Sequence, residues 1–353
     1  ERHAGETVLD GTDAAVQPVV LADEVGDEGV PRLLVQPGRR VDLLHMAGIP
    51  AAALAFLPGD GRIGAAMVAA RECAGVAFTG STEVARIIAR SLADKDGPIV
   101  PLIAETGGQN ALIADSSALP EQIVRDVVAS AFNSAGQRCS ALRVLYIQTD
   151  IADRVSEMLA GAMQELRIGN PAELATDVGP VIDEAARGVL AAHARWLDSF
   201  AKPIFTCPLD DDATRHGTFF APRAYEIDSI ARLEREVFGP ILHLVRWRSE
   251  DLDQVCAAIA HTGYGLTLGI HSRIDETIKR ITDRLHVGNT YVNRNIIGAV
   301  VGVQPFGGEG LSGTGPKAGG PHYLYRFASE RTVSVDTTAA GGNAGLMALD
   351  EGE

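Results

Sequence analysis

One cysteine in the sequence could serve as a nucleophile. Cys139 follows a turn-forming glycine in the stretch "NSAGQRCSALR", whereas Cys73, Cys207 and Cys256 have no comparable neighbours. A cysteine thiolate attacks electrophilic carbon readily, but a free cysteine is more often a small buried hydrophobic side chain. The stretch by itself leaves both interpretations open.

Two carboxylates stand at turns that could belong to the same site. Glu105 ends the apolar run "PLIAE" before a Gly-Gly pair, and Glu236 and Phe238 precede the Gly-Pro turn of "REVFGPIL". A carboxylate at the end of a buried strand is costly unless it is solvated, paired or functional. We therefore treat Glu105 as a candidate functional residue.

Two glycine-containing junctions could bind a phosphate group. "GDGRIG", residues 59–64, matches the G-x-G-x-x-G pattern of dinucleotide-binding loops through Gly61 and Gly64, although a single match is a weak signal. In "FTGSTEVA", Gly80 permits a tight turn and Ser81 can cap a helix whose free N–H groups attract anions. An ordinary helix cap explains this second junction equally well.

The composition excludes several classes of function. The chain has 353 residues, 46% of them hydrophobic, and a net charge of −15. Because no basic segment is present, we expect no nucleic-acid partner. No apolar run reaches membrane-spanning length, no signal-peptide pattern opens the sequence, and the cysteines form neither CxxC pairs nor a metal-ligand array. We expect a cytoplasmic protein with no metal site and no membrane attachment of its own.

Strand-like and helix-like segments alternate along most of the chain. Apolar runs predict strands at residues 52–58, 75–78, 99–105, 110–115 and 143–148, and apolar periodicity predicts helices at residues 62–74, 83–94, 120–136, 150–169 and 250–263. Such alternation is typical of an α/β protein with a parallel sheet. Residues 1–40 show no sustained period, and residues 302–321 form a long glycine-rich loop.

The clearest helix determines where Cys139 lies. Pro120 suits the first helical turn, an apolar stripe continues from it, and Gly136 ends the helix, so that Cys139 falls on the turn just beyond. We predict that Asp150 is the N-cap of the next helix and that Cys256 is a core residue of a third.

Several segments, taken in order, resemble the aldehyde dehydrogenase superfamily. They are "FTGSTEVA", "ETGGQNA", "GQRCSALR", "EVFGPIL", "YGLTLGI" and "PFGGEGLSG", and the resemblance runs from about Ala47 to the C-terminus. The longer stretches around them look like the glutamate γ-semialdehyde dehydrogenase branch. The final segment, "ERTVSVDTTAAGGNAGLMALD", resembles the C-terminal end of the bifunctional proline utilization A family, which also carries a flavin-dependent proline dehydrogenase.

This resemblance implies the NAD-dependent oxidation of a small aldehyde, L-glutamate γ-semialdehyde, to L-glutamate. Cys139 would attack the carbonyl carbon, hydride would pass to NAD, and Glu105 would activate the water that releases the acid. We expect the N–H groups of the turn to lower the pKa of the Cys139 thiol.

The resemblance also implies the binding residues. The cofactor-binding positions are Gly61, Gly64, Gly80, Ser81, Glu236 and Phe238. Among them, Ser81 would contact the pyrophosphate, Glu236 the nicotinamide ribose, and Phe238 would pack beside it. Ser140 and the N–H groups of an anchor loop at Gly298 and Ala299 would hold the substrate carboxylate. Phe306 would pack on the aliphatic part of the substrate.

The implied architecture is an α/β, aldehyde dehydrogenase-like fold. We expect a partial Rossmann-type NAD-binding domain at residues 46–108 and an α/β catalytic domain at residues 109–300. An anchor loop and a return to the cofactor domain would follow at residues 301–330, and a C-terminal tail at residues 331–353. By the same resemblance we expect a homo-oligomer.

Residues 1–45 depart from the family pattern. The family's Pro-Trp-Asn segment, whose asparagine helps to form the oxyanion hole, and its Lys-Pro-x-Glu segment, which binds the adenosine ribose, are both missing from the sequence. We interpret residues 1–45 as a truncated, rearranged or frameshifted remnant. Two hypotheses remain: an NAD-dependent dehydrogenase module, or a non-catalytic fragment that keeps the fold and an oligomerisation surface.

Overall fold

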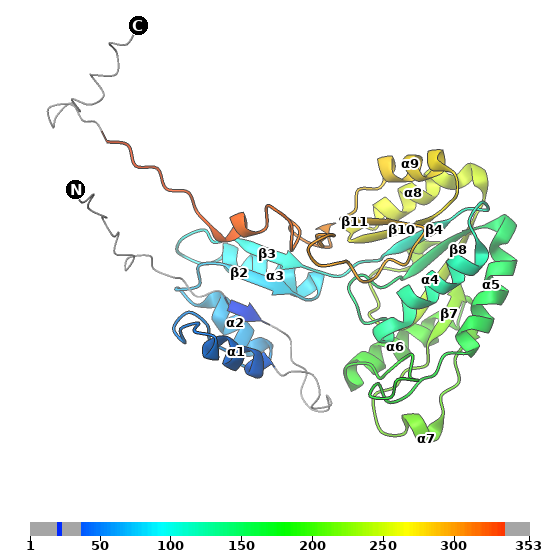
Figure 1. Ribbon diagram of the computed structural model, residues 1–353, viewed down its shortest axis with the longest axis horizontal. Coiled ribbons are helices and arrows are strands. Elements are labelled where there is room, and N and C mark those ends of the chain that lie inside the picture. The colour runs from blue at the N-terminus through cyan, green and yellow to red at the C-terminus, as the bar shows by residue number, and fades with distance from the viewer. Residues whose placement is uncertain (1–19, 23–36, 336–353) are drawn as a thin grey trace, which may run out of the picture.

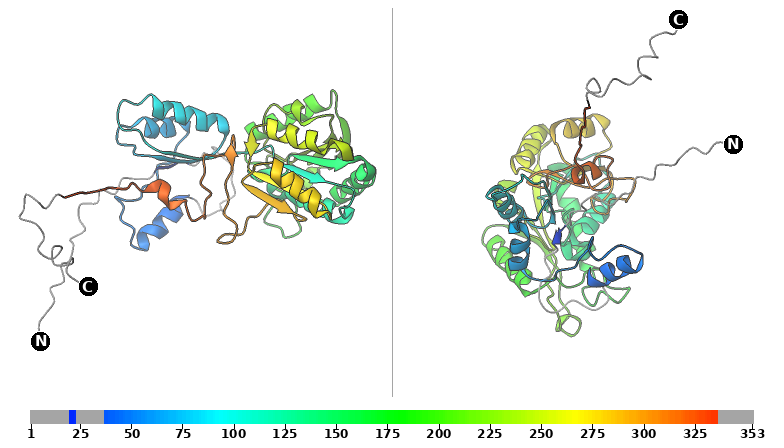
Figure 2. Two further views of the ribbon diagram at one scale, coloured as in Figure 1. Left: turned by 90° about the horizontal axis from the view of Figure 1, so that it is seen from above. Right: turned by 90° about the vertical axis from the view of Figure 1, so that its left-hand side faces the viewer.

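The computed structural model describes residues 20–22 and 37–335 as two lobes (Figure 1). A larger lobe contains a long mixed sheet, and a smaller lobe contains a short parallel sheet. The chain crosses between them after β3 and returns through a glycine-rich segment near the C-terminus, and the view from above shows the same separation (Figure 2).

The smaller lobe has a parallel sheet whose described strands lie in the order β1-β2-β3. Its elements are β1 (Val20–Ala22), α1 (Pro37–Met46), α2 (Gly61–Ala69), β2 (Val76–Thr79), α3 (Thr82–Ala93) and β3 (Leu102–Glu105). A small cluster of apolar side chains, among them Val76, Phe78 and Ile88, packs between α3 and the sheet. This core is small, and its helical side consists of Val68 on α2 and of Ala85 and Ile88 on α3.

Two features of the smaller lobe differ from the sequence expectation. Residues 52–58 form turns and irregular chain rather than a strand, and Leu57 is 60% exposed. An apolar run becomes a strand only where a neighbouring strand can pair with it, and the described residues provide none there. Conversely, β1 lies in a segment with no periodic signal, yet it pairs in parallel with β2. Most of the predicted remnant at residues 1–45 and of the predicted tail lies outside the described residues.

The larger lobe is built on a sheet with the strand order β11-β10-β4-β5-β8-β7-β6. Its strands are β4 (Ala111–Ala114), β5 (Val144–Gln148), β6 (Lys202–Thr206), β7 (Arg223–Glu226), β8 (Ile241–Trp247), β10 (Thr267–His271) and β11 (Asn289–Val292). Neighbouring strands pair in parallel except β6 with β7. Helices α4 (Pro120–Phe132), α5 (Thr149–Gln164), α6 (Glu184–Leu197), α7 (Asp211–Thr214), α8 (Leu252–His261) and α9 (Asp275–Arg284) complete the lobe.

The central strands of this sheet are buried along their whole length. Every residue of β4 and β5 is buried, as expected for parallel strands that helices cover on both faces. Cys256 lies in this core on α8, as predicted. Pro120 opens α4, also as predicted, but Asp150 is not an N-cap, because α5 already begins at Thr149.

A glycine-rich segment ties the two lobes together. Ser312 accepts a hydrogen bond from the N–H of Thr106 at 3.1 Å, and its hydroxyl accepts one from the N–H of Gly265 at 3.0 Å. The N–H of Thr314 donates to the Ala104 carbonyl at 2.9 Å. The segment also contains β12 (Glu309–Gly310), which pairs antiparallel with β9 (Tyr264–Gly265). The edge of β3 is therefore fixed against the larger lobe.

Candidate active site

The turn that carries Cys139 has an unusual backbone. Ser134, Ala135 and Gly136 have φ angles of +55°, +53° and +64°, and left-handed conformations are uncommon for the first two residue types. A Cβ atom at Gly136 would lie 2.4 Å from the Gly239 carbonyl oxygen, so only glycine fits there. Tertiary packing therefore holds the chain in a sharp turn just before the nucleophile candidate.

Asn110 fixes the chain on the other side of Cys139. Its amide Nδ2 donates to the carbonyl oxygens of Cys139 at 2.7 Å and Ala141 at 2.9 Å, and its Oδ1 accepts from the N–H of Thr267 at 3.1 Å. The sequence analysis did not identify Asn110, although its place directly before β4 and after a Gly-Gly pair was a usable signal. It acts on the nucleophile turn by holding its backbone.

The environment of the Cys139 thiol differs from the expectation. Cys139 is partly exposed, and its pKa is raised, first by burial and then by the charge of Glu236, with a smaller contribution from Glu105. The N–H groups of Ser140 and Cys139 oppose this rise but do not overcome it. The predicted lowering of the pKa is therefore wrong, because neither the burial of the thiol nor the nearby carboxylates can be read from the local sequence.

Glu105 lies at the end of β3, where the two lobes meet. Burial raises the pKa of its carboxyl group to about 7, although the N–H of Gly308 partly offsets the effect. Its Oε1 atom is buried without a hydrogen-bond partner among the described residues. A Cβ atom at Gly307 would lie 3.2 Å from both carboxylate oxygens, so the glycine-rich segment forms one wall of the carboxylate site. A group with these properties can exchange a proton near neutral pH.

Glu236 is brought to the same region by a buried arginine. Nη2 of Arg143 contacts Oε1 of Glu236 at 2.9 Å, and the N–H of Gly108 donates to Oε2 at 3.1 Å. Arg143 also donates to the carbonyl oxygens of Gly136 at 2.7 Å and Gly239 at 3.1 Å. Burial raises the pKa of Glu236 and Arg143 opposes that rise. Arg143, which the sequence analysis missed, thus links the nucleophile turn to the Glu236 loop.

The remaining cofactor candidates lie mainly at the carboxyl end of β2. Gly80 follows β2 and donates its N–H to the Glu105 carbonyl at 3.1 Å. Ser81 is the N-cap of α3, and its hydroxyl accepts from the N–H of Val84 at 3.2 Å. Phe238 is 42% exposed, and its ring lies 5.1 Å from the Arg143 guanidinium. The structure thus brings the Ser81 turn, Glu105 and the Glu236 loop to the boundary between the two lobes, which we call the seam.

Gly61 and Gly64 lie elsewhere in the smaller lobe. Gly61 is the first residue of α2 and Gly64 follows within its first turn. A Cβ atom at either position would meet nothing within 4 Å, so both leave open space beside the helix. Asp60 caps α2 by accepting from the N–H of Arg62.

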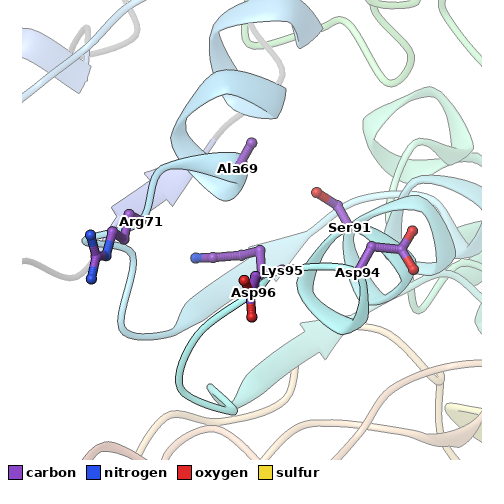
Figure 3. Close-up of a pocket in the computed structure, with 6 residues that line it drawn as sticks. All are labelled: Ala69, Arg71, Ser91, Asp94, Lys95 and Asp96. Carbon is purple, nitrogen blue, oxygen red and sulfur yellow. The ribbon is translucent and has the colours of Figure 1, made fainter.

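A pocket of about 630 Å³ lies away from this seam (Figure 3). It is lined by Ala69, Arg71, Ser91, Asp94, Lys95 and Asp96. These residues precede β2 and β3 in the chain and therefore lie at the amino ends of both strands. In open parallel sheets, ligands bind beyond the carboxyl ends of the strands, so this pocket is not the place for a dinucleotide.

The substrate-binding candidates come from three segments of the larger lobe. Ser140 is buried beside Cys139, and the Thr267 hydroxyl donates to its carbonyl oxygen at 3.3 Å. Gly298 is exposed with a φ angle of +70°, followed by the half-buried Ala299. Phe306 exchanges backbone hydrogen bonds with Ala318 and is half-buried.

One protein-family model matches most of the chain. The model described as "Aldehyde dehydrogenase family" matches residues 39–333. The chain belongs to this family. It is 54% identical over 303 residues to the bifunctional protein PutA of Escherichia coli (strain K12), which covers 84% of this chain but only 23% of that protein. It is also 37% identical to the 1-pyrroline-5-carboxylate dehydrogenase of Geobacillus kaustophilus, covering 83% of this chain and 57% of that enzyme.

Solved structures of the same family share this fold. A proline utilization A structure from Bradyrhizobium japonicum is 63% identical with a TM-score of 0.82, covering 85% of this aldehyde dehydrogenase chain and 30% of that protein. A 1-pyrroline-5-carboxylate dehydrogenase from Thermus with bound NAD is 33% identical with a TM-score of 0.76, covering 81% of this chain and 55% of that enzyme. The chain thus spans about a quarter of the PutA proteins and just over half of the single-function enzymes.

The described residues contain neither a membrane-spanning helix nor a cluster of metal ligands. Within residues 20–22 and 37–335, no helix is both long and apolar enough to cross a membrane. The same residues contain no group of three or more His, Cys, Asp or Glu side chains that could bind a metal ion.

Proposed function

We propose that this chain oxidises L-glutamate γ-semialdehyde to L-glutamate with NAD as the acceptor. The observation that carries the proposal is the convergence at one seam of a partly exposed cysteine and a carboxyl group with a pKa of about 7. Both Glu236 and Glu105 act on the pKa of Cys139, which means that all three side chains share one site. The likeness to 1-pyrroline-5-carboxylate dehydrogenases supports the choice of substrate.

The chain's own residues account for the covalent steps. Cys139 Sγ attacks the aldehyde carbon as the C=O π bond breaks, and the thiol proton passes through water to the former carbonyl oxygen, which gives a hemithioacetal. After oxidation a thioester joins the acyl group to Cys139. Glu105, ionised above about pH 7, takes a proton from a water molecule, and the resulting hydroxide attacks the thioester carbon and releases the acid. Cys139 leaves as the thiolate and is ready for another aldehyde.

The residues at the seam fit one half of NAD. The N–H groups at the start of α3 suit a pyrophosphate, and we infer that Glu236 and the exposed Phe238 contact the nicotinamide riboside. Gly107 permits the approach of Glu236, since a Cβ atom there would lie 1.6 Å from its carboxylate. NAD, when bound, would accept the hydride from the hemithioacetal. The open space beside Gly61 and Gly64 would leave room for the adenosine half of NAD.

The substrate carboxylate would bind at the anchor loop. Gly298, with its positive φ, and Ala299 can present backbone N–H groups toward Ser140, and a charge-assisted hydrogen bond contributes about 1.5–3 kcal/mol. Phe306 would pack on the methylene groups of the substrate. Ser140→Ala should therefore weaken the use of the semialdehyde about ten- to a hundredfold while affecting simple aliphatic aldehydes much less.

A non-catalytic role is the second candidate. It is favoured by the irregular chain at residues 52–58, where the sequence predicts a strand. In that case the chain would keep the fold and act through an oligomerisation surface.

One experiment separates the two candidates. NADH formation is followed by its absorbance, with pyrroline-5-carboxylate, which hydrolyses to the semialdehyde, as the substrate. Turnover that disappears in Cys139→Ala supports the enzyme. Absence of turnover together with a folded, oligomeric protein supports the second candidate.

Assembly and location belong to the same proposal. We infer a homo-oligomer in the cytoplasm that binds a small aldehyde and has no nucleic-acid partner. The acidic net charge of −15 is consistent with the last point. Sedimentation velocity over a range of concentrations tests the assembly, and a single species with the mass of one chain would contradict it.

A further inference from the structure

Ser130 on α4 contacts both segments proposed to hold the substrate, one through its backbone carbonyl and the other through its hydroxyl. It is fully buried on the last turn of α4. Its backbone carbonyl accepts a hydrogen bond from the N–H of Leu142 at 2.9 Å, which fixes the chain just after the nucleophile turn. Its hydroxyl accepts one from the N–H of Ile296 at 3.1 Å, two residues before Gly298.

The hydroxyl group is oriented for this contact. Ser130 Oγ donates its hydrogen to the Asp126 carbonyl at 2.5 Å. A hydroxyl has one donor and two acceptor positions, so the bond to Asp126 leaves the lone pairs of Oγ for the Ile296 N–H. Ile296 is fully buried, and a buried N–H without a partner carries a substantial desolvation cost. Ser130 therefore determines where the anchor loop leaves β11.

The loop beyond Ile296 has a long contact at Ile297, whose carbonyl oxygen accepts from Nη2 of Arg294 at 3.4 Å, and it is held again at its far end. Among the described contacts, the N–H of Val300 donates to Oε1 of Gln304 at 3.0 Å, and the N–H of Gln304 donates back to the Val300 carbonyl at 2.8 Å. Gly298, between these two anchors, is exposed, and a Cβ atom there would meet nothing within 4 Å. The position of its N–H group thus depends on the contacts that precede it, of which the hydrogen bond from Ile296 to Ser130 is the shorter.

We propose that Ser130 is a positioning residue that sets the distance between the Cys139 turn and the anchor loop, and so makes the site selective for aldehydes with a distal carboxylate. This inference rests on the proposed function. It concerns a side chain that touches neither the aldehyde nor the cofactor and acts through Ile296 alone. The expected signature is a loss of substrate binding without a loss of chemistry.

The test compares Ser130→Ala with a matched control, Ser156→Ala. Ser156 lies on the neighbouring helix α5, and its hydroxyl is buried without a hydrogen-bond partner among the described residues. Both substitutions remove one buried oxygen. Amide hydrogen exchange is measured for a peptide that contains Ile296 and Gly298, and kinetics are measured with the semialdehyde and with propanal.

For Ser130→Ala we expect faster exchange in that peptide and a KM for the semialdehyde raised about tenfold, the effect of one lost hydrogen bond. The kcat value and the kcat/KM for propanal should stay within about twofold of the unmodified chain. Ser156→Ala should change none of these quantities. Equal losses with both aldehydes, or unchanged exchange in the Ile296 peptide, would overturn the inference.

A second variant keeps the inference testable if Ser130→Ala does not fold. Ser130→Cys keeps a polar atom at the same place but offers a weaker acceptor, so exchange and KM should lie between those of the unmodified chain and Ser130→Ala. If Ser130→Ala does not fold, Ser130→Cys decides, and a value equal to the unmodified chain contradicts the role. If the unmodified chain oxidises neither aldehyde, the proposed function fails, and the exchange rates alone decide on Ser130.

Discussion

The two lobes differ in how many apolar side chains they bury. The larger lobe surrounds β4 and β5 with helices, and its core includes fully buried side chains such as Leu112 and Leu145. The smaller lobe buries only a short row of side chains under α3, and Ile87 and Ile99 remain exposed. Cys139 stands on the first lobe, whereas Glu105 and Ser81 stand on the second. The candidate nucleophile is therefore placed on the extensively packed lobe, and the candidate base and the α3 cap on the lobe with the smaller core.

The largest expected effect tests the assignment of the nucleophile to the larger lobe. Cys139→Ala should abolish NADH formation, a loss of about a thousandfold or more, because no other described cysteine faces the seam. Cys256→Ala, a substitution in the core of the same lobe, should lower stability and leave the rate per folded molecule unchanged. Initial rates with folded protein measure both. A rate that survives in Cys139→Ala would remove the nucleophile from this turn.

The next effect concerns the carboxylate on the smaller lobe. Because the pKa of Glu105 is about 7, the ionised base is lost as the pH falls below 7, and the rate should fall with it. The raised pKa of Cys139 makes the rate continue to rise at alkaline pH. Glu105→Gln should lower kcat about a hundred- to ten-thousandfold and remove the inflection near pH 7. An inflection that persists in Glu105→Gln would assign it to another group.

A pair of core substitutions tests the difference in packing directly. Leu145→Ala should lower the free energy of unfolding by about 2–5 kcal/mol, because β5 cannot collapse around the cavity. Ile88→Ala in the smaller lobe should cost about 2 kcal/mol or less, because the side chain is covered from fewer directions. Urea denaturation measures both changes. Equal costs would show that the two lobes are packed equally well.

The smallest effect concerns the helix cap on the smaller lobe. Ser81→Ala should cost about 1 kcal/mol of stability, since its hydroxyl no longer accepts from Val84. If the start of α3 binds the pyrophosphate, NAD affinity should also fall severalfold, because the frayed first turn presents its N–H groups less well. Calorimetric titration with NAD measures this change. A stability loss with unchanged affinity would place the pyrophosphate elsewhere.

The sequence by itself determined the family, the strand–helix alternation and the candidate nucleophile. Motifs such as "GQRCSALR" and "ETGGQNA" are short and continuous in the sequence. The cap at Ser81 and the burial of Cys256 also depend on neighbouring residues, so they can be predicted from the sequence. Such prediction failed for residues 52–58, because an apolar run does not show whether a partner strand exists.

Only the tertiary structure decided the electrostatics of the site and the residues that support it. The pKa of Cys139 is raised because burial and two carboxylates from distant segments outweigh the N–H groups of its own turn. Asn110, Arg143 and Ser130 act through contacts with segments far away in the chain. The partners in these contacts cannot be identified from a local pattern, because they are set by how the strands and helices pack against each other.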